Sequence, residues 1–138
     1  MPIEVVRGPG VPAGERRGGL VANVDLAPTI AAWAGAEPPE DPDGRSLAPL
    51  LSSTPPGSWR EALLIEHFVG SDWVGLRTPR YTYVEHEGGD RELYDMHKDP
   101  YQIDNIYDKA GATFLKALRS RLDDLKDCAG ARCREAEG

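Results

Sequence analysis

Residues 73–84 read Trp-Val-Gly-Leu-Arg-Thr-Pro-Arg-Tyr-Thr-Tyr-Val. Side chains alternate in character on each side of Thr78-Pro79-Arg80, a spacing typical of two strands joined by a turn. The apolar run Leu63 to Phe68 precedes them, and Gly88-Gly89 reverses the chain into Glu92-Leu93-Tyr94. Four strands with such short connections predict an antiparallel meander.

A helical period follows the strands, from about Ala112 to Lys126. One stripe of this helix carries four leucines, Leu115, Leu118, Leu122 and Leu125. The stripe lasts about one and a half heptads, short of the three or four that a coiled coil needs. We expect it to cover one face of the sheet, because an uncovered four-stranded sheet exposes too much apolar area.

The chain before the meander predicts a strand, an irregular loop and a helix. Ile3 to Val6 is an apolar run bounded by Pro2 and Gly8, as expected for a buried strand. Glycines and prolines then make residues 7–19 irregular. A helix is expected over 25–34, with Asp25 as its cap.

The ends of this helix and its apolar face are also marked in the sequence. Pro28 falls in the first turn, and Gly35 offers a left-handed stop. Leu26, Ile30 and Trp33 share one face, which must be buried against something. The acidic stretch 37–44 that follows lacks the ligand spacing of an EF-hand calcium site, and its prolines favour a solvated linker.

Composition describes an ordinary soluble globular chain. The 138 residues are 40% hydrophobic and 28% charged, which suffices for one domain with a modest core. A formal net charge of −7 disfavours nucleic acid or an anionic membrane as a partner, because either requires clustered Lys and Arg. No apolar run approaches the roughly 20 residues of a membrane span.

Six segments carry a family resemblance through their order and spacing. They are the Pro-Gly stretch at 2–14, Val-Asp-Leu-Ala-Pro-Thr-Ile and Asp-Gly-Arg-Ser-Leu-Ala-Pro-Leu-Leu within 19–51, Trp-Arg-Glu and Leu-Leu-Ile-Glu-His at 59–67, the pair of strands at 73–84, Glu-Leu-Tyr-Asp at 92–95, and Asp-Pro with Asp-Asn-Ile at 99–106. Together they resemble the C-terminal third of a sulfatase, in the alkaline-phosphatase-like superfamily. The closing Cys-Ala-Gly-Ala-Arg-Cys-Arg is most similar to the N-acetylglucosamine-6-sulfatase and related secreted branch.

The resemblance implies an α+β fold: a four-stranded antiparallel sheet packed against a C-terminal helix, preceded by a strand-loop-helix remnant of the α/β catalytic domain. Residues 1–55 would be the tail end of that catalytic domain, and residues 56–138 the C-terminal subdomain. The whole enzyme would hydrolyse sulfate esters, including those of sulfated sugars. This chain would have a structural and pocket-shaping role.

Sulfatases owe their chemistry to residues that this chain lacks. Their nucleophile is a formylglycine made from the Cys or Ser of a Cys-x-Pro-Ser-Arg signature, beside a calcium ion held by Asp and Asn. Here Cys128 leads into Ala-Gly-Ala-Arg and Cys133 into Arg-Glu-Ala. The family's metal ligands lie upstream of residue 1. We therefore expect no catalytic residue, metal ligand or cofactor in this chain, with calcium and formylglycine belonging to the parent enzyme.

Four residues near the strand ends are candidates for contact with substrate: Glu66, His67, Trp73 and Arg77. His67 can hold a sugar hydroxyl or sulfate oxygen, and Trp73 offers an indole face for a sugar ring. Arg77 can bind an anion bidentately. Three of them have a structural alternative: His67 as a hydrogen-bonded surface histidine, Trp73 as a sheet-core tryptophan, and Arg77 as an arginine paired with Glu66 or Glu85.

Cys128 and Cys133 are either a local disulfide or two free thiols. The close spacing and the resemblance to secreted enzymes favour the disulfide, which would pin the chain end, and a secreted or extracytoplasmic location.

The implied partner is the rest of the parent sulfatase chain. Without that partner, residues 3–34 would have unpaired backbone edges and exposed apolar faces, and we expect self-association there. Two other interpretations stay open: the same region of a related phosphodiesterase or phosphonate hydrolase, and a free-standing binding or interaction module.

Overall fold

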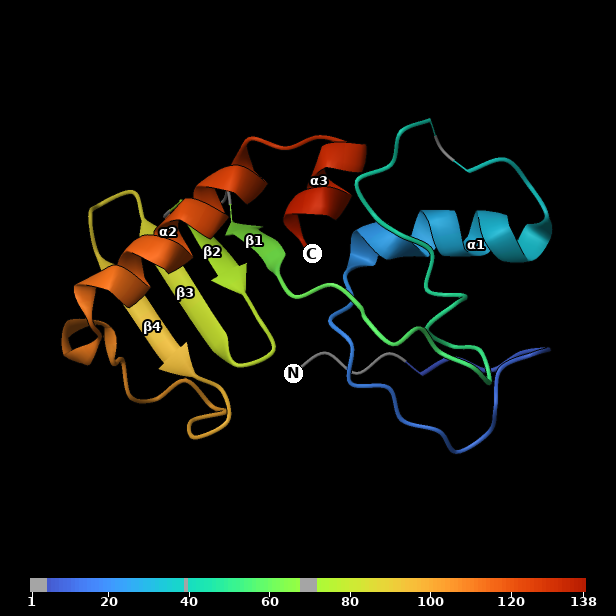
Figure 1. Ribbon diagram of the computed structural model, residues 1–138, viewed down its shortest axis with the longest axis horizontal. Helices are drawn as coiled ribbons and strands as arrows, with labels where there is room; N and C mark the ends of the chain where they lie inside the picture. The colour runs from blue at the N-terminus through green and yellow to red at the C-terminus, as the bar shows by residue number, and fades with distance from the viewer. Residues whose placement is uncertain (1–4, 39, 68–71) are drawn as a thin grey trace.

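A computed structural model describes residues 5–38, 40–67 and 72–138 of the chain (Figure 1). In chain order the elements are η1 (Asn23–Asp25), α1 (Leu26–Ala34), β1 (Leu63–His67), β2 (Trp73–Arg77), β3 (Tyr81–His86), β4 (Arg91–Asp95), η2 (Tyr107–Lys109), α2 (Ala112–Lys126) and α3 (Ala131–Ala136). Within the described ranges, no helix has the length and apolar character needed to cross a membrane.

The strands form an antiparallel sheet in the order β1-β2-β3-β4, which confirms the predicted meander. Leu76 of β2 lies opposite Leu64 of β1 and Tyr83 of β3, and Leu93 of β4 lies opposite Tyr83. Because side chains directly opposite each other in a sheet share a face, one apolar row crosses all four strands. The predicted strand at Leu63 to Phe68 ends at His67 as described, and Phe68 lies outside the described residues.

Helix α2 packs on that apolar row, with its axis across the strands (Figure 1). Leu122 is fully buried and Leu118 and Leu125 nearly so, while Leu115 packs at the margin of the same cluster. The predicted leucine stripe and the α+β fold class are both confirmed. The core is completed by Tyr83, which is 2% exposed.

The segment before the sheet differs from its prediction at the start. Val5 and Val6 lie in no strand, and Val5 is 89% exposed, while Ile3 and Glu4 lie outside the described residues. A strand needs a neighbouring strand to pair with, and none of the described residues supplies one here. The predicted helix forms as η1 followed by α1, and Gly35 ends it in the left-handed conformation at φ 64°.

The apolar face of α1 is not covered. Leu26, Ile30 and Trp33 are 46%, 63% and 49% exposed. Figure 1 shows α1 on the side of the molecule away from the sheet, with α3 lying between the two parts. The C-terminal helix α3 was not predicted, because its six residues are too few for a helical period to show in the sequence.

Candidate functional site

A hollow crosses the end of the sheet where β1 leads into β2 and β3 leads into β4. It measures about 340 Å³ and is lined by His67, Asp72, Trp73, Val74, Glu85, His86, Glu87 and Arg91. These residues come from both faces of the sheet, so the hollow wraps around its end. We call it the sheet-end hollow.

Two of the predicted site residues meet at this hollow. His67 and Trp73 are directly opposite each other in the β1–β2 pair, and their rings stack with centroids 5.8 Å apart and planes 4° from parallel. His86 lies opposite Trp73 on the other side, and its Nε2 is 2.8 Å from Oε1 of Glu92. Aromatic faces beside hydrogen-bonding side chains are what a sugar ring with its hydroxyl groups requires.

The other two predicted site residues lie elsewhere. Glu66 is opposite Val74 on the face of the sheet that α2 covers, whereas the neighbouring His67 points to the other face. Arg77 is at the far end of β2, about 13 Å along the strand from Trp73. The structure therefore does not unite the four residues in one site.

The predicted structural pairing of Arg77 with Glu66 or Glu85 is wrong, because Arg77 bonds Thr82. Its Nη1 donates to Thr82 Oγ1 at 3.2 Å. Glu85 instead has its Oε1 3.5 Å from Arg91 Nε and 3.6 Å from Arg119 Nε. Partial burial lowers the pKa of Arg77, and the side chain is only half-exposed at the sheet surface.

Tyr94 belongs to a set of hydrogen-bonded polar side chains on the face of the sheet that α2 does not cover. Its hydroxyl donates to Glu92 Oε2 at 2.8 Å, and Glu92 also contacts His86. Burial, helped by that hydrogen bond, raises the pKa of Tyr94 to about 12. Tyr94 is therefore a neutral hydrogen-bond donor at ordinary pH.

A buried ion pair joins the two parts of the molecule. Arg60 Nη1 and Nη2 each donate to an Asp25 carboxylate oxygen at 2.6 Å, and both side chains are 0% exposed. Asp25 also accepts from the backbone N–H of Ala22 and of Arg45, at 2.8 and 2.9 Å. Its carboxylate bonds none of the N–H groups of α1, so the predicted cap of that helix lacks its hydrogen bond; Asp25 instead bonds the Ala22 N–H at the start of η1 and pairs with Arg60.

Glu137, at the end of the chain, completes this cluster. Its Oε2 lies 2.9 Å from Arg45 Nη2 and 3.1 Å from Arg60 Nε, although the Arg60 Nε–H is not aligned for a hydrogen bond. Its backbone carbonyl accepts from the N–H of Glu61 and Ala62 at 2.8 and 3.0 Å. Burial raises the pKa of Glu137, against the opposing effect of Arg60 and Arg45.

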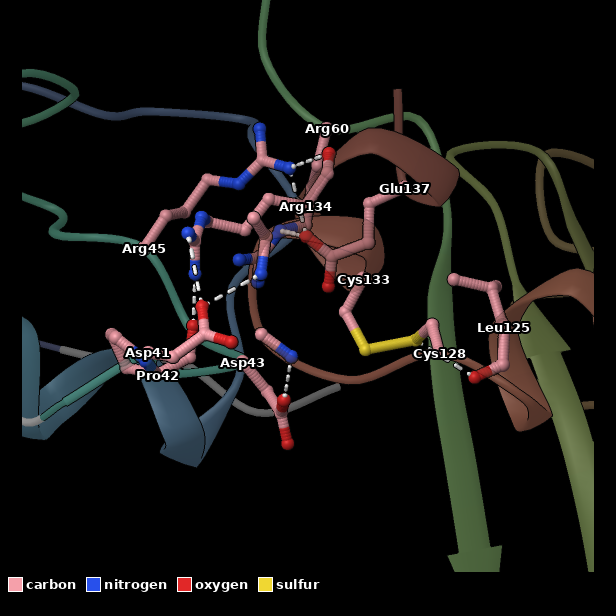
Figure 2. Close-up of a disulfide and its surroundings, with 12 residues drawn as sticks. Asp41, Pro42, Asp43, Arg45, Arg60, Leu125, Cys128, Cys133, Arg134 and Glu137 are labelled. Atoms are coloured by element: carbon pink, nitrogen blue, oxygen red, sulfur yellow. Dashed lines mark hydrogen bonds and ion pairs between the residues drawn. A yellow bond between two sulfur atoms is a disulfide. The ribbon is translucent and has the colours of Figure 1, made fainter.

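Two further features hold α3 beside the ion-pair cluster: part of the acidic stretch 37–44 and the two cysteines (Figure 2). Asp43 Oδ1 accepts from the N–H of Gly130 at 2.6 Å, and Arg134 Nη1 donates to the carbonyl of Pro42. Residues 41–43 are therefore docked at α3, whereas residues 37, 38 and 40 are exposed, as the predicted solvated linker requires. Cys128 and Cys133 form the predicted disulfide, which fixes α3 to the end of α2.

Sequence reasoning missed Arg45 and Glu137 and saw only a cap in Asp25. A signal was present at two of the four ionic positions, because Asp25 and Arg60 are charged residues within largely apolar stretches of sequence. Their pairing spans 35 residues of chain, and that of Arg45 with Glu137 spans 92. Local patterns carry no information about partners at that separation.

Metal-binding clusters and free thiols are both absent from the described residues. In residues 5–38, 40–67 and 72–138, no group of three or more His, Cys, Asp or Glu side chains is placed to bind a metal ion. Both cysteines are consumed by the disulfide and neither is a free thiol.

Known proteins match this chain over almost all of its length. The family model "N-sulphoglucosamine sulphohydrolase, C-terminal" matches residues 1–128. N-acetylglucosamine-6-O-sulfatase of Bacteroides thetaiotaomicron is 33% identical over an alignment that covers 91% of this chain and 25% of that protein. The chain thus spans about a quarter of that curated relative.

Solved structures give the same result. A 2-O GAG sulfatase superposes with a TM-score of 0.74 at 32% identity, over 92% of this chain and 32% of that one. A protein solved in complex with its substrate D-glucosamine-2-N,6-O-disulfate gives a TM-score of 0.70 at 30% identity, over 82% of this chain and 24% of that one. The phosphonate monoester hydrolase of Silicibacter pomeroyi follows at 0.65 and 27%, over 83% and 26%. The chain therefore belongs to the N-sulphoglucosamine sulphohydrolase C-terminal family, the C-terminal region of sulfatases.

Proposed function

We propose that this chain acts as the non-catalytic C-terminal region of a sulfatase that hydrolyses sulfate esters of sugars. The observation that carries the proposal is the match of nearly the whole chain to about a quarter of sulfatases, combined with the lack of a nucleophile signature. The sulfated-sugar substrate is supported by the named substrate of one structural relative and by the stacked His67–Trp73 pair.

In this proposal the reacting groups lie in the part of the enzyme that precedes this chain. Formylglycine would supply the nucleophile there, and calcium would neutralise charge on the sulfuryl oxygens. The residues present here would position and shape the pocket. Trp73 would offer a ring face to the sugar, His67 and His86 would hydrogen-bond its hydroxyl groups, and the ion-pair cluster would hold the sheet-end hollow at a fixed angle to the catalytic part.

The disulfide supports a place for the parent protein outside the reducing cytosol, because disulfides persist in oxidising compartments. The rest of the parent chain is the proposed partner, and its surface would cover Leu26, Ile30 and Trp33. Their exposure supports this, since an apolar face of that kind is normally buried.

A second candidate function is supported by the phosphonate monoester hydrolase among the structural relatives. The coding sequence upstream of residue 1 separates the two functions. A Cys- or Ser-x-Pro-Ser-Arg signature followed by hydrolysis of glucosamine 6-sulfate supports the sulfatase. A plain Thr or Ser nucleophile with turnover of phosphonate esters supports the alternative, and a stop codon just before residue 1 contradicts both.

The full protein also tests the role of the hollow. Trp73→Ala should raise KM for the sulfated sugar at least about tenfold with a smaller change in kcat, because a stacking surface binds substrate and transition state alike. Tyr101→Ala, which removes an aromatic ring that is 83% exposed, is the matched control and should leave KM unchanged. Equal effects of both substitutions would contradict a substrate role for Trp73.

A further inference from the structure

Three cationic side chains converge on a second hollow, although the chain has a net charge of −7. This cationic hollow measures about 200 Å³ and is lined by Tyr83, Arg91, Tyr107, Leu115, Lys116 and Arg119. We propose that the cationic hollow binds sulfate, either as the free ion or as an ester carried on a sugar.

The charge balance of the hollow favours an anion. Glu85 is the carboxylate that its arginines share, and its Oε1 accepts a 2.6 Å hydrogen bond from the Tyr83 hydroxyl. Arg91 Nε and Arg119 Nε lie 3.5 and 3.6 Å from the same oxygen. Charge-assisted hydrogen bonds are about 2.7–2.9 Å long, so both contacts are loose. Three positive charges therefore face one negative charge that is already hydrogen-bonded.

Donors remain available for a ligand. Lys116 makes no ion pair or side-chain hydrogen bond in the described part of the chain, and Arg119 contacts only Glu85 there. Both residues lie on the same side of α2, because residues three apart in a helix are neighbours. Arg91 is held from the opposite wall, with its Nη1 donating to the carbonyls of His86 and Asp90 at 3.2 and 2.9 Å.

The floor of the hollow is rigid. Tyr83 belongs to the core and stacks on Tyr107, with ring centroids 6.3 Å apart and planes 17° from parallel. Leu115 packs against the same core. Because the apolar floor beneath the three cations is already ordered, binding loses little further conformational entropy. This favours a small ligand of defined shape.

The size of the hollow favours a small anionic ligand over a large one. Pockets for drug-sized ligands measure about 300–1,000 Å³, so about 200 Å³ suits a tetrahedral oxyanion or one sulfated sugar ring better than an oligosaccharide. The free ion needs no assumption about the enzyme. The sugar ester rests on the proposed function, and the two sources are distinguished by separate titrations.

The experiment is a titration of the chain with sodium sulfate, at constant ionic strength, followed through backbone amide NMR shifts. We expect saturable shifts at residues 91, 107 and 115–119. The double variant Lys116→Gln/Arg119→Gln should weaken binding at least about tenfold, because it removes two charge-assisted hydrogen bonds. The matched control Lys126→Gln/Arg132→Gln makes the same change of charge outside the hollow and should bind as the unaltered chain does.

A second arm uses glucosamine 6-sulfate and glucosamine. Tighter binding of the sulfated sugar than of sulfate indicates an ester ligand, and equal or weaker binding indicates the free ion. Glucosamine should not bind in either case. The proposal is overturned if sulfate gives no saturable shifts, if the shifts lie outside the hollow, or if both double variants lose affinity equally. None of these readouts depends on hydrolysis, so failure here leaves the proposed function standing.

Discussion

The sheet with α2 and the segment that precedes it are stabilised in different ways. In the sheet part, Leu76, Leu93 and Leu122 are all 0% exposed and form one core. The preceding segment, residues 5–59, buries few large apolar side chains, and its fully buried Asp25 is held by an ion pair to Arg60.

This difference separates a unit that folds on its own contacts from one that depends on others. A core made of neighbouring strands and one helix needs no outside partner. A segment whose helix leaves Leu26, Ile30 and Trp33 exposed depends on polar anchors and on cover from elsewhere. The ion-pair cluster of Asp25, Arg45, Arg60 and Glu137 therefore couples the two parts. Removing it should lower the free energy of unfolding more than any other change considered below.

Arg60→Ala should destabilise the chain by about 3–5 kcal/mol, because it leaves the buried carboxylate of Asp25 without a cationic partner and leaves Glu137 paired with Arg45 alone. Urea unfolding followed by tryptophan fluorescence measures this change. Lys109→Ala removes the exposed pair with Asp104, in which both side chains are more than 60% exposed, and should cost about 0–1 kcal/mol. Similar midpoints for the two variants would show that the buried pair does not couple the two parts.

Two leucine substitutions compare the parts directly. Leu122→Ala removes a fully buried side chain from the core and should cost about 2–5 kcal/mol. Leu26→Ala removes a side chain of α1 that is 46% exposed, and should change stability by no more than about 0.5 kcal/mol. A comparable loss in both variants, measured by urea unfolding, would mean that α1 is covered in solution, as self-association through residues 3–34 would produce.

The same contrast explains which features the sequence predicts. Strands such as 73–77 and 81–86 follow from alternation and from turn residues, which act over a few positions. The leucine stripe of α2 is equally local. The cluster of Asp25, Arg60 and Glu137 is built from segments far apart in the chain, and the helix α3 depends on that cluster and on the disulfide.

The candidate site shows the same division. His67 and Trp73 are brought together by a register that the strand pattern implies, because they flank one short connection. Glu66 and Arg77 are predicted to join this site only because they are close to His67 and Trp73 in the sequence. The two-residue period of a strand puts Glu66 on the opposite face, and three residues of β2 separate Arg77 from Trp73. The division of domains at residues 55 and 56 stays a prediction.

Hydrogen exchange measures the stability of each part in one experiment. Amides of residues 5–34 should exchange about a hundredfold faster than those of residues 73–84, because local opening exposes the first segment without unfolding the sheet. Protection that rises with protein concentration in residues 5–34 alone would indicate the self-association that we propose. Equal protection of both segments at every concentration would show that the chain is a self-sufficient domain.

The smallest expected effect is a pH dependence of stability that has opposite signs in the sheet and in the ion-pair cluster. The hydrogen bond from Arg80 lowers the pKa of Asp95 in the sheet part below its ordinary 3.8. The stability that this pairing contributes is complete above the ordinary pKa of 3.8 and is lost as pH falls through the lowered pKa. Burial raises the pKa of Glu137 above its ordinary 4.5. The folded chain then binds the proton more readily than the unfolded chain, so stability declines as pH rises through that window.

Urea midpoints between pH 3 and 6 separate the two contributions to stability, with one variant in the sheet and one in the ion-pair cluster. Asp95→Asn should remove acid sensitivity below about pH 4, where an unpaired Asp titrates, and leave the slope at higher pH unchanged. Glu137→Gln should flatten the decline above about pH 4.5 and leave the acid limb unchanged. If either substitution altered both limbs equally, the sheet and the ion-pair cluster would titrate as one coupled unit, and a charge change at the chain end would be transmitted into the sheet.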